Sequence, residues 1–279
     1  MSGSTPYFII ALAYASAALA AWLPDARAHP ALGPEQASGA SRAPLVRGLM
    51  VIAFVAQGFA LSHALLGGEG LNIGFSHAIS LIIWLVVAVS MLITLDSGFV
   101  VLATRVVGPI ALAAALLPLV LPAQRIVHYV GLPARLHIVV AILGYALFTV
   151  ASLQALLMLA LERRLHAGNL PPALQGMPPL LRLERFLFRL LLVAFVLLTA
   201  TVVSGVFFTE ALFGRAFELN HKAVFAVLSW AIFGGLLFGH WRFGWRGRLA
   251  VRWTLFGFAA LLLSYVGSKF VLEIILQRV

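Results

Sequence analysis

Apolar residues fall in eight long runs along the chain, and short segments between the runs hold most of the polar residues. An α-helix needs about 20 apolar residues to cross the roughly 30 Å hydrocarbon core of a bilayer. The pattern therefore predicts an all-α polytopic membrane protein with about eight transmembrane helices, forming a single transmembrane domain over residues 1–279. The predicted spans are about 7–24, 47–66, 76–95, 99–121, 136–162, 186–209, 221–240 and 250–274.

The segments between the runs contain residues that interrupt helices. Residues 24–43 are rich in Pro, Ala and Ser and predict a loop, and Pro171 and Pro172 interrupt the segment 166–177. The first run has no basic residues before it, so it is typical of a transmembrane helix rather than a cleaved signal peptide. No internal repeat is visible, which disfavours a transporter built from two related halves.

The basic residues predict the orientation of the helices. The loops after the first, third, fifth and seventh runs hold 12 Lys and Arg residues, and the other loops and termini hold 6. Cytoplasmic loops carry the excess of Lys and Arg. We therefore expect both termini on the outer, periplasmic side of a bacterial inner membrane.

Composition agrees with a lipid-facing surface. Of 279 residues, 62% are hydrophobic and 10% are charged, whereas soluble domains carry about 25% charged residues. The net charge of +10 comes from basic residues beside the apolar runs, so it indicates orientation in the bilayer and not a nucleic-acid partner. The chain has no cysteine, which excludes disulfides, thiolate metal sites and covalent attachment of haem to this chain.

Histidines are the candidate functional residues. His221 and His240 bound the same run, and 19 residues at ~1.5 Å each place them roughly 28 Å apart, near opposite membrane faces. With the predicted orientation, His137 and His221 each begin a span near the outer face. Three further histidines are predicted near that face: His63 at the end of the second span, His77 at the start of the third and His128 in the loop after the fourth. A single histidine at a helix end often lies among lipid headgroups without binding a ligand. His137, His221 and His240 are the strongest candidates.

Imidazoles without cysteine or acidic partners favour haem iron over zinc, calcium or magnesium. The sequence contains no phosphate-binding glycine loop, nucleophile elbow or pair of catalytic carboxylates. We therefore expect a binding protein, not an enzyme.

Three motifs carry a resemblance to a known family. They are His137 with Gly144-Tyr145-Ala146, then Met177-Pro178-Pro179 with Glu184-Arg185, and His240 with Gly244-Trp245-Arg246-Gly247-Arg248. Together they resemble the CcsA/CcmC-type cytochrome c assembly proteins, and most closely the YpjD-like branch. The resemblance covers the last four spans, about half the chain, and it implies that haem is presented at the outer membrane surface. It also implies that His137 is the first outer histidine and His240 the intramembrane histidine near the inner face.

The chain departs from that family between the sixth and seventh spans. The family has a tryptophan-rich motif there, whereas this chain has phenylalanines, and it has no histidine after residue 268. The resemblance then implies haem stacked on these rings with His137 and His221 as axial ligands to the iron. Basic residues near the outer face, including Arg135 and Lys222, would neutralise the haem propionates. The phenylalanines are Phe207, Phe208, Phe213 and Phe217.

Three functions remain open from the sequence. The first is a haem-binding protein of the cytochrome c assembly type, whose partners are the bilayer, haem and other maturation proteins. The second is a membrane accessory or structural subunit that kept the fold and lost haem. The third is an ion or metabolite transporter.

Overall fold

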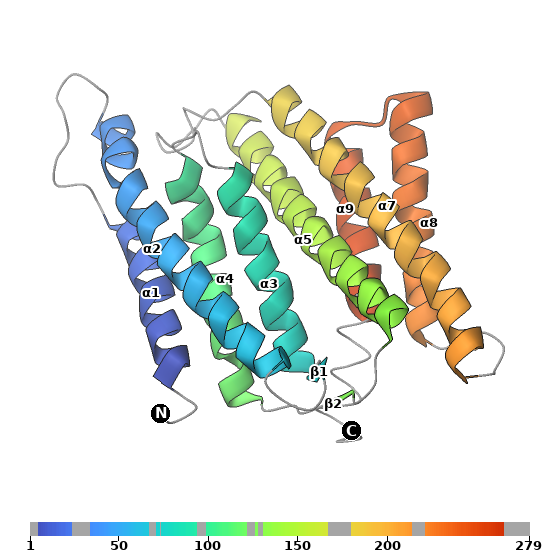
Figure 1. Cartoon of the computed structure of the whole chain (residues 1–279). Helices are drawn as coiled ribbons and strands as arrows, with labels where there is room; N and C mark the ends of the chain where they lie inside the picture. Colours follow the sequence, from blue (N-terminus) through green and yellow to red (C-terminus); the bar gives the residue numbers. More distant parts are fainter. Residues whose placement is uncertain are drawn as a thin grey trace. The chain divides into compact units, whose positions relative to one another are not determined.

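The structure is a computed structural model that describes residues 5–23, 34–66, 71–72, 74–93, 99–121, 126–127, 131–166, 180–213 and 221–264 (Figure 1). Within these ranges the chain forms eight α-helices and one pair of two-residue strands. Six of the helices are long and apolar enough to cross a membrane. The prediction of an all-α polytopic membrane protein is confirmed. The helices group into two compact units, and the prediction of a single transmembrane domain stays a prediction.

Unit 1 contains the first four helices. α1 packs against α2 and α4, and α3 packs against α4. A short antiparallel pair of strands, β1 (Leu71–Asn72) and β2 (Ile126–Val127), was not predicted from the sequence. The helices are α1 (Thr5–Trp22), α2 (Pro34–Leu66), α3 (Phe75–Ile93) and α4 (Phe99–Val120).

A buried hydrogen-bond chain ties three helices of unit 1 together. The Tyr14 hydroxyl of α1 donates to Gln57 Oε1 of α2 at 2.6 Å, and Gln57 Nε2 donates to Ser80 Oγ of α3 at 3.0 Å. All three side chains are buried. A buried polar group without a partner is costly in an apolar setting, so the chain of hydrogen bonds fixes how these helices are rotated against one another.

Unit 2 contains the last four helices. α5 packs along α7 and α9, and α8 packs against α7 and α9. In the core, Phe148 of α5 stacks on Phe233 of α8 with ring centroids 4.0 Å apart. A Cβ atom at Gly257 of α9 would lie 2.8 Å from the Phe233 ring, so glycine lets α9 approach α8 closely. The helices are α5 (Leu132–His166), α7 (Leu180–Phe213), α8 (His221–Phe243) and α9 (Gly247–Leu262).

Several helices extend past the predicted spans. α2 begins at Pro34, inside the predicted loop 24–43, so that part of the prediction is wrong. Proline is well tolerated in the first turn of a helix because its missing N–H has no partner there. α5 and α7 also begin earlier and end later than the apolar runs 136–162 and 186–209. Arg and Glu favour helix as strongly as Leu does, so apolar runs mark the bilayer portion and not the helix ends.

Candidate functional site

His137 lies near the start of α5 and contacts the last part of α7. Its Nδ1 atom is 2.7 Å from Ser204 Oγ. The Ser204 hydroxyl also lies 2.6 Å from the carbonyl oxygen of Ala200. A serine that donates its one proton to this carbonyl can accept from the imidazole. In the tautomer that carries its proton on Nδ1, His137 donates to Ser204, and Nε2 has the lone pair that a metal would need.

His240 lies in the last turn of α8, at the opposite end of unit 2. Its Nδ1 atom is 2.8 Å from the carbonyl oxygen of Trp245. A carbonyl oxygen only accepts, so Nδ1 carries the proton and Nε2 keeps the lone pair. The imidazole also lies flat against Phe188 of α7, with ring centroids 3.5 Å apart and an interplanar angle of 14°.

A tight corner between α8 and α9 brings the Trp245 carbonyl to His240. Gly244 has φ +66°, and its N–H donates to the His240 carbonyl at 3.1 Å, which ends the helix in a left-handed turn. Trp245 then folds back onto α8, where a Cβ atom at Gly239 would lie only 2.3 Å from its ring. The corner therefore depends on glycine at both positions.

Two glutamates anchor this corner to the other helices of unit 2. Glu184, near the start of α7, accepts from the Gly247 N–H at 3.1 Å. Glu162, near the end of α5, accepts from Arg248 Nε at 2.8 Å. The two contacts give the motif Gly244-Trp245-Arg246-Gly247-Arg248 a physical role, because they hold the loop that orients His240.

The two histidines belong to separate sites. Their contacts on α7, Phe188 and Ser204, are 16 residues apart, which corresponds to about 24 Å along the helix. Two axial nitrogens on one iron lie within a few ångströms of each other. His137 and His240 therefore cannot ligate the same iron.

Comparison with known proteins gives these sites a family context. The family model described as "Cytochrome C assembly protein" matches residues 46–276. The chain belongs to the cytochrome c assembly protein family. The match begins within α2, so family membership extends over more of the chain than the last four spans that carry the sequence motifs.

Curated relatives agree with this membership. The chain is 33% identical to "Inner membrane protein YpjD" of Escherichia coli (strain K12) over 233 residues, which are 81% of this chain and 85% of that protein. It is 22% identical to "Protein HemX" of Brevibacillus brevis over 227 residues, 80% and 84% of the two chains. A shorter match, 29% over 91 residues, relates it to "Cytochrome c biogenesis protein CcsA" of Heterosigma akashiwo (strain NIES-293 / 8280G21-1), covering 33% and 28%. This family member is a multi-pass inner-membrane protein, in agreement with the name of YpjD and with its own apolar helices.

The structure describes the side chains of only some of the other predicted site residues of this cytochrome c assembly protein. His221 begins α8 at the same end of unit 2 as His137 (Figure 1), but its side chain lies outside the described part of the structure. Phe207 is 67% exposed and Arg135 is exposed, whereas Lys222 is half-buried. The side chains of Phe208 and Phe213 lie outside the described part of the structure, and so does the whole of Phe217.

Two histidines of unit 1 were also noted in the sequence, and the structure shows the surroundings of both. His63 packs its ring edge-on against Phe59 at 4.8 Å between centroids, and His77 is buried at the start of α3. Within the described ranges, no three His, Asp or Glu side chains gather around one point.

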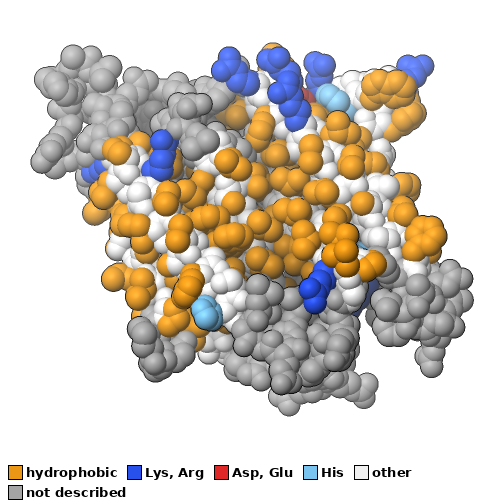
Figure 2. Space-filling model, viewed as in Figure 1, with side chains coloured by type: hydrophobic (Ala, Val, Ile, Leu, Met, Phe, Trp, Pro, Cys, Tyr) orange, Lys and Arg blue, Asp and Glu red, His pale blue; other side chains and the backbone are white. Residues whose placement is uncertain are grey.

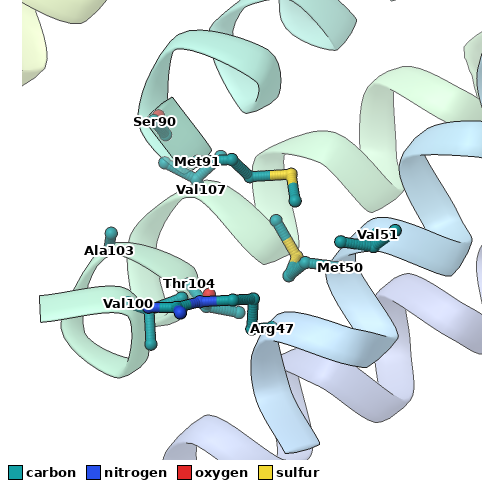
Figure 3. A pocket seen from close by; sticks show the side chains of 9 residues that line it. All are labelled: Arg47, Met50, Val51, Ser90, Met91, Val100, Ala103, Thr104 and Val107. Carbon is teal, nitrogen blue, oxygen red and sulfur yellow. The ribbon is translucent and has the colours of Figure 1, made fainter. Parts of the chain in front are cut away.

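A small cavity in unit 1 lies between α2, α3 and α4 (Figure 3). Its volume is about 90 Å³ and its lining is mostly apolar, with the thioethers of Met50 and Met91 extending into it. Pockets for small molecules usually measure about 300–1,000 Å³. The cavity is therefore far too small for a macrocycle such as haem.

Proposed function

We propose that this protein binds haem in the membrane and presents it at the outer face during cytochrome c assembly, with His137 as a ligand of the iron. Haem is the cargo in this proposal, and the role is binding and delivery without catalysis by side chains. Family membership supports the proposal, as do the names of relatives in cytochrome c biogenesis.

The observation that carries the proposal is the hydrogen bond between His137 Nδ1 and Ser204 Oγ. Histidines that bind metals almost always donate their other ring N–H to an acceptor, which fixes the tautomer and the direction of the ligating nitrogen. Ser204 provides that acceptor and leaves the Nε2 lone pair for iron. Neutral imidazole is a common haem ligand, so the donor fits the cargo.

Other residues at this end of unit 2 suit the rest of the haem. The exposed ring of Phe207, three residues after Ser204, offers an apolar surface to the porphyrin. Arg135 and Lys222 supply positive charge for the propionates. His221, at the start of α8, is the proposed second axial ligand.

His240 is proposed as a second, separate haem ligand near the inner face. Its Nδ1 is also tied to an acceptor, the Trp245 carbonyl, so the same argument about the tautomer applies. One face of its ring is covered by Phe188, which limits how the imidazole can turn.

The distribution of arginines supports this orientation. The end of unit 2 that holds His240 carries nine exposed arginines and two glutamates, and the positive-inside rule assigns such an end to the cytoplasm. His137 then lies toward the outer face, and both termini lie outside. The arginines are Arg163, Arg164, Arg182, Arg185, Arg189, Arg242, Arg246, Arg248 and Arg252.

An absorption spectrum tests the proposal. Protein purified in detergent from haem-replete cells is expected to show a Soret band, and His137→Ala is expected to weaken it while His63→Ala leaves it unchanged. His63 is a suitable control because its ring packs against Phe59 in the other unit. A folded, haem-free wild-type protein from such cells would contradict the proposal.

A second candidate function has its own support. The segment 207–222 lacks tryptophan, and residues 268–279 lack histidine. A family member that presents haem in the usual way would be expected to have the tryptophans and the histidine. An accessory membrane subunit that kept the family fold without haem would purify without pigment and together with a membrane partner. The same spectrum and a search for a stoichiometric partner separate the two functions.

A further inference from the structure

An arginine stripe, Arg182, Arg185 and Arg189, runs along one face of α7. These positions are spaced i, i+3 and i+7, so they lie within one narrow arc of the helix surface. All three side chains are exposed. Figure 2 shows Lys and Arg side chains gathered where α5 ends and α7 begins, above a broad hydrophobic surface.

The same face of α7 continues as an apolar stripe. Leu192, Val193, Val196 and Val203 are 50–59% exposed, and at 100° per residue they fall within about 80° of Arg182 on the helix. This is the portion of α7 that is hydrophobic enough to cross the bilayer. The face therefore presents cationic groups first and a lipid-facing hydrocarbon surface directly after them.

The positive charge of the arginine stripe is not neutralised locally. This end of unit 2 has an excess of seven positive charges, because nine arginines stand against two glutamates. Both glutamates are engaged at the corner between α8 and α9, Glu162 with Arg248 and Glu184 with the Gly247 N–H. Within the described residues, the three stripe arginines form no ion pair with an acidic side chain.

We propose that this face of α7 is a binding site for an anionic phospholipid. The phosphate is held by Arg182, Arg185 and Arg189, and the acyl chains lie along Leu192, Val196 and Val203. A guanidinium group offers a planar pair of donors that matches phosphate oxygens. The long side chain of Arg189 reaches back from the apolar run toward the headgroup level.

The continuity of the two stripes selects a lipid over other anions. A soluble phosphate or an acidic protein segment would use the cationic groups and have no use for the hydrocarbon surface below them. A phospholipid uses both, with its charge and its chains in the order that α7 presents. The inference does not depend on haem binding.

The test compares two triple variants of the full-length protein that remove the same charge from the same end. R182Q/R185Q/R189Q removes the stripe, and R163Q/R164Q/R246Q removes three exposed arginines outside it. Bound phosphatidylglycerol is counted by native mass spectrometry during titration, with phosphatidylcholine as the neutral comparison. Each interfacial arginine contributes roughly a 5-fold preference for anionic lipid, so the stripe variant is expected to bind about 100-fold more weakly. The matched variant is expected to change little.

Further measurements make each outcome decisive. Equal losses in the two triple variants, or no loss in either, would overturn the site. Displacement of the lipid by inorganic phosphate or by glycerophosphoglycerol, which has the headgroup without chains, would show a soluble-anion site instead. If the glutamine variant does not fold, R182K/R185K/R189K keeps the charge but loses the planar donors. That variant is expected to bind more weakly than the wild type, because an ammonium group lacks the planar pair of donors. Unchanged binding by it would also overturn the proposal.

Discussion

The two histidines of unit 2 are held by different kinds of contact. At one end, His137 is hydrogen-bonded to a side-chain hydroxyl, that of Ser204, on a neighbouring helix. At the other end, His240 donates to the backbone carbonyl of Trp245 and is also stacked on Phe188. The Ser204 side chain contacts the first imidazole, whereas a folded corner of the backbone contacts the second. The difference predicts that the imidazole at the His137 end is easier to reorient than the imidazole at the His240 end.

Rigidity at His240 rests on how tightly its corner is packed. Trp245 lies against Gly239 so closely that no side chain fits between them, and it also packs against Trp253 with ring centroids 5.3 Å apart. Gly205, beside His137, is different, because a Cβ atom there would lie 3.6 Å from His137 Cε1, an ordinary contact distance. The same glycine substitution should therefore have opposite consequences at the two ends.

The largest expected effect comes from Gly239→Ala. The new Cβ atom would overlap the Trp245 ring at 2.3 Å, so the ring moves and takes its carbonyl away from His240. Overpacking of this kind costs about 1–3 kcal/mol. The thermal unfolding midpoint in detergent should fall clearly, and any haem signal that depends on His240 should fall with it.

Gly205→Ala is the matched control for that substitution. It adds the same methyl group beside the other histidine, in the interior of α7, where alanine is favoured over glycine by about 0.5–1 kcal/mol. Its midpoint should equal or exceed that of the wild type. A similar fall of the unfolding midpoint in the two variants would mean that the side chains beside Gly205 and Gly239 are packed equally tightly. The proposed difference between the two ends of unit 2 would then be wrong.

The next effect in size concerns the acceptor of His137. Ser204→Ala removes the hydroxyl that is hydrogen-bonded to His137 Nδ1, whereas no side-chain replacement removes the backbone acceptor of His240. Loss of such a partner weakens metal binding about 10-fold or more. Titration of the apoprotein with haem should show this loss at the outer site, with the unfolding midpoint nearly unchanged.

Ser204→Thr provides the control, because threonine keeps the hydroxyl. Thr199 and Thr201 of α7 already direct their hydroxyls to the carbonyl four residues earlier, as Ser204 does, so threonine fits this pattern. Haem affinity should stay near the wild-type value. Equal weakening by alanine and threonine would assign the effect to packing and not to the hydrogen bond.

The sequence predicted the helices well because apolar runs of bilayer length have few alternative structures. The early start of α2 at Pro34 was missed, because hydropathy does not register a helix outside the hydrocarbon core. The prediction identified His137 and His240 as candidates, but Ser204 was missed, since its contact joins residues 67 positions apart. No local pattern marks such a pair.

The corner at His240 shows a different limit of sequence reasoning. The motif Gly244-Trp245-Arg246-Gly247-Arg248 was recognised as part of the family resemblance. The atom that contacts His240 is a backbone carbonyl, which has no signature in the side-chain sequence. No sequence pattern indicates that Phe188 of α7 stacks on His240, 52 positions further along the chain. The phenyl cluster proposed around His221 stays a prediction.

The smallest expected effect tests the outermost contact of the same corner. Arg248→Gln removes the ion pair with Glu162, whose two side chains are 55% and 24% exposed. Such pairs contribute about 0.2–1 kcal/mol, because water competes for both charges. The unfolding midpoint should fall slightly in nonionic detergent at low salt, and the difference should shrink near 1 M salt, where the screening length is about 3 Å. Arg246→Gln, which removes a neighbouring arginine without an ion pair among the described residues, should leave the midpoint unchanged. A loss for Arg248→Gln as large as that for Gly239→Ala would mean that the corner is held from outside by charge and not from inside by the packing of Trp245.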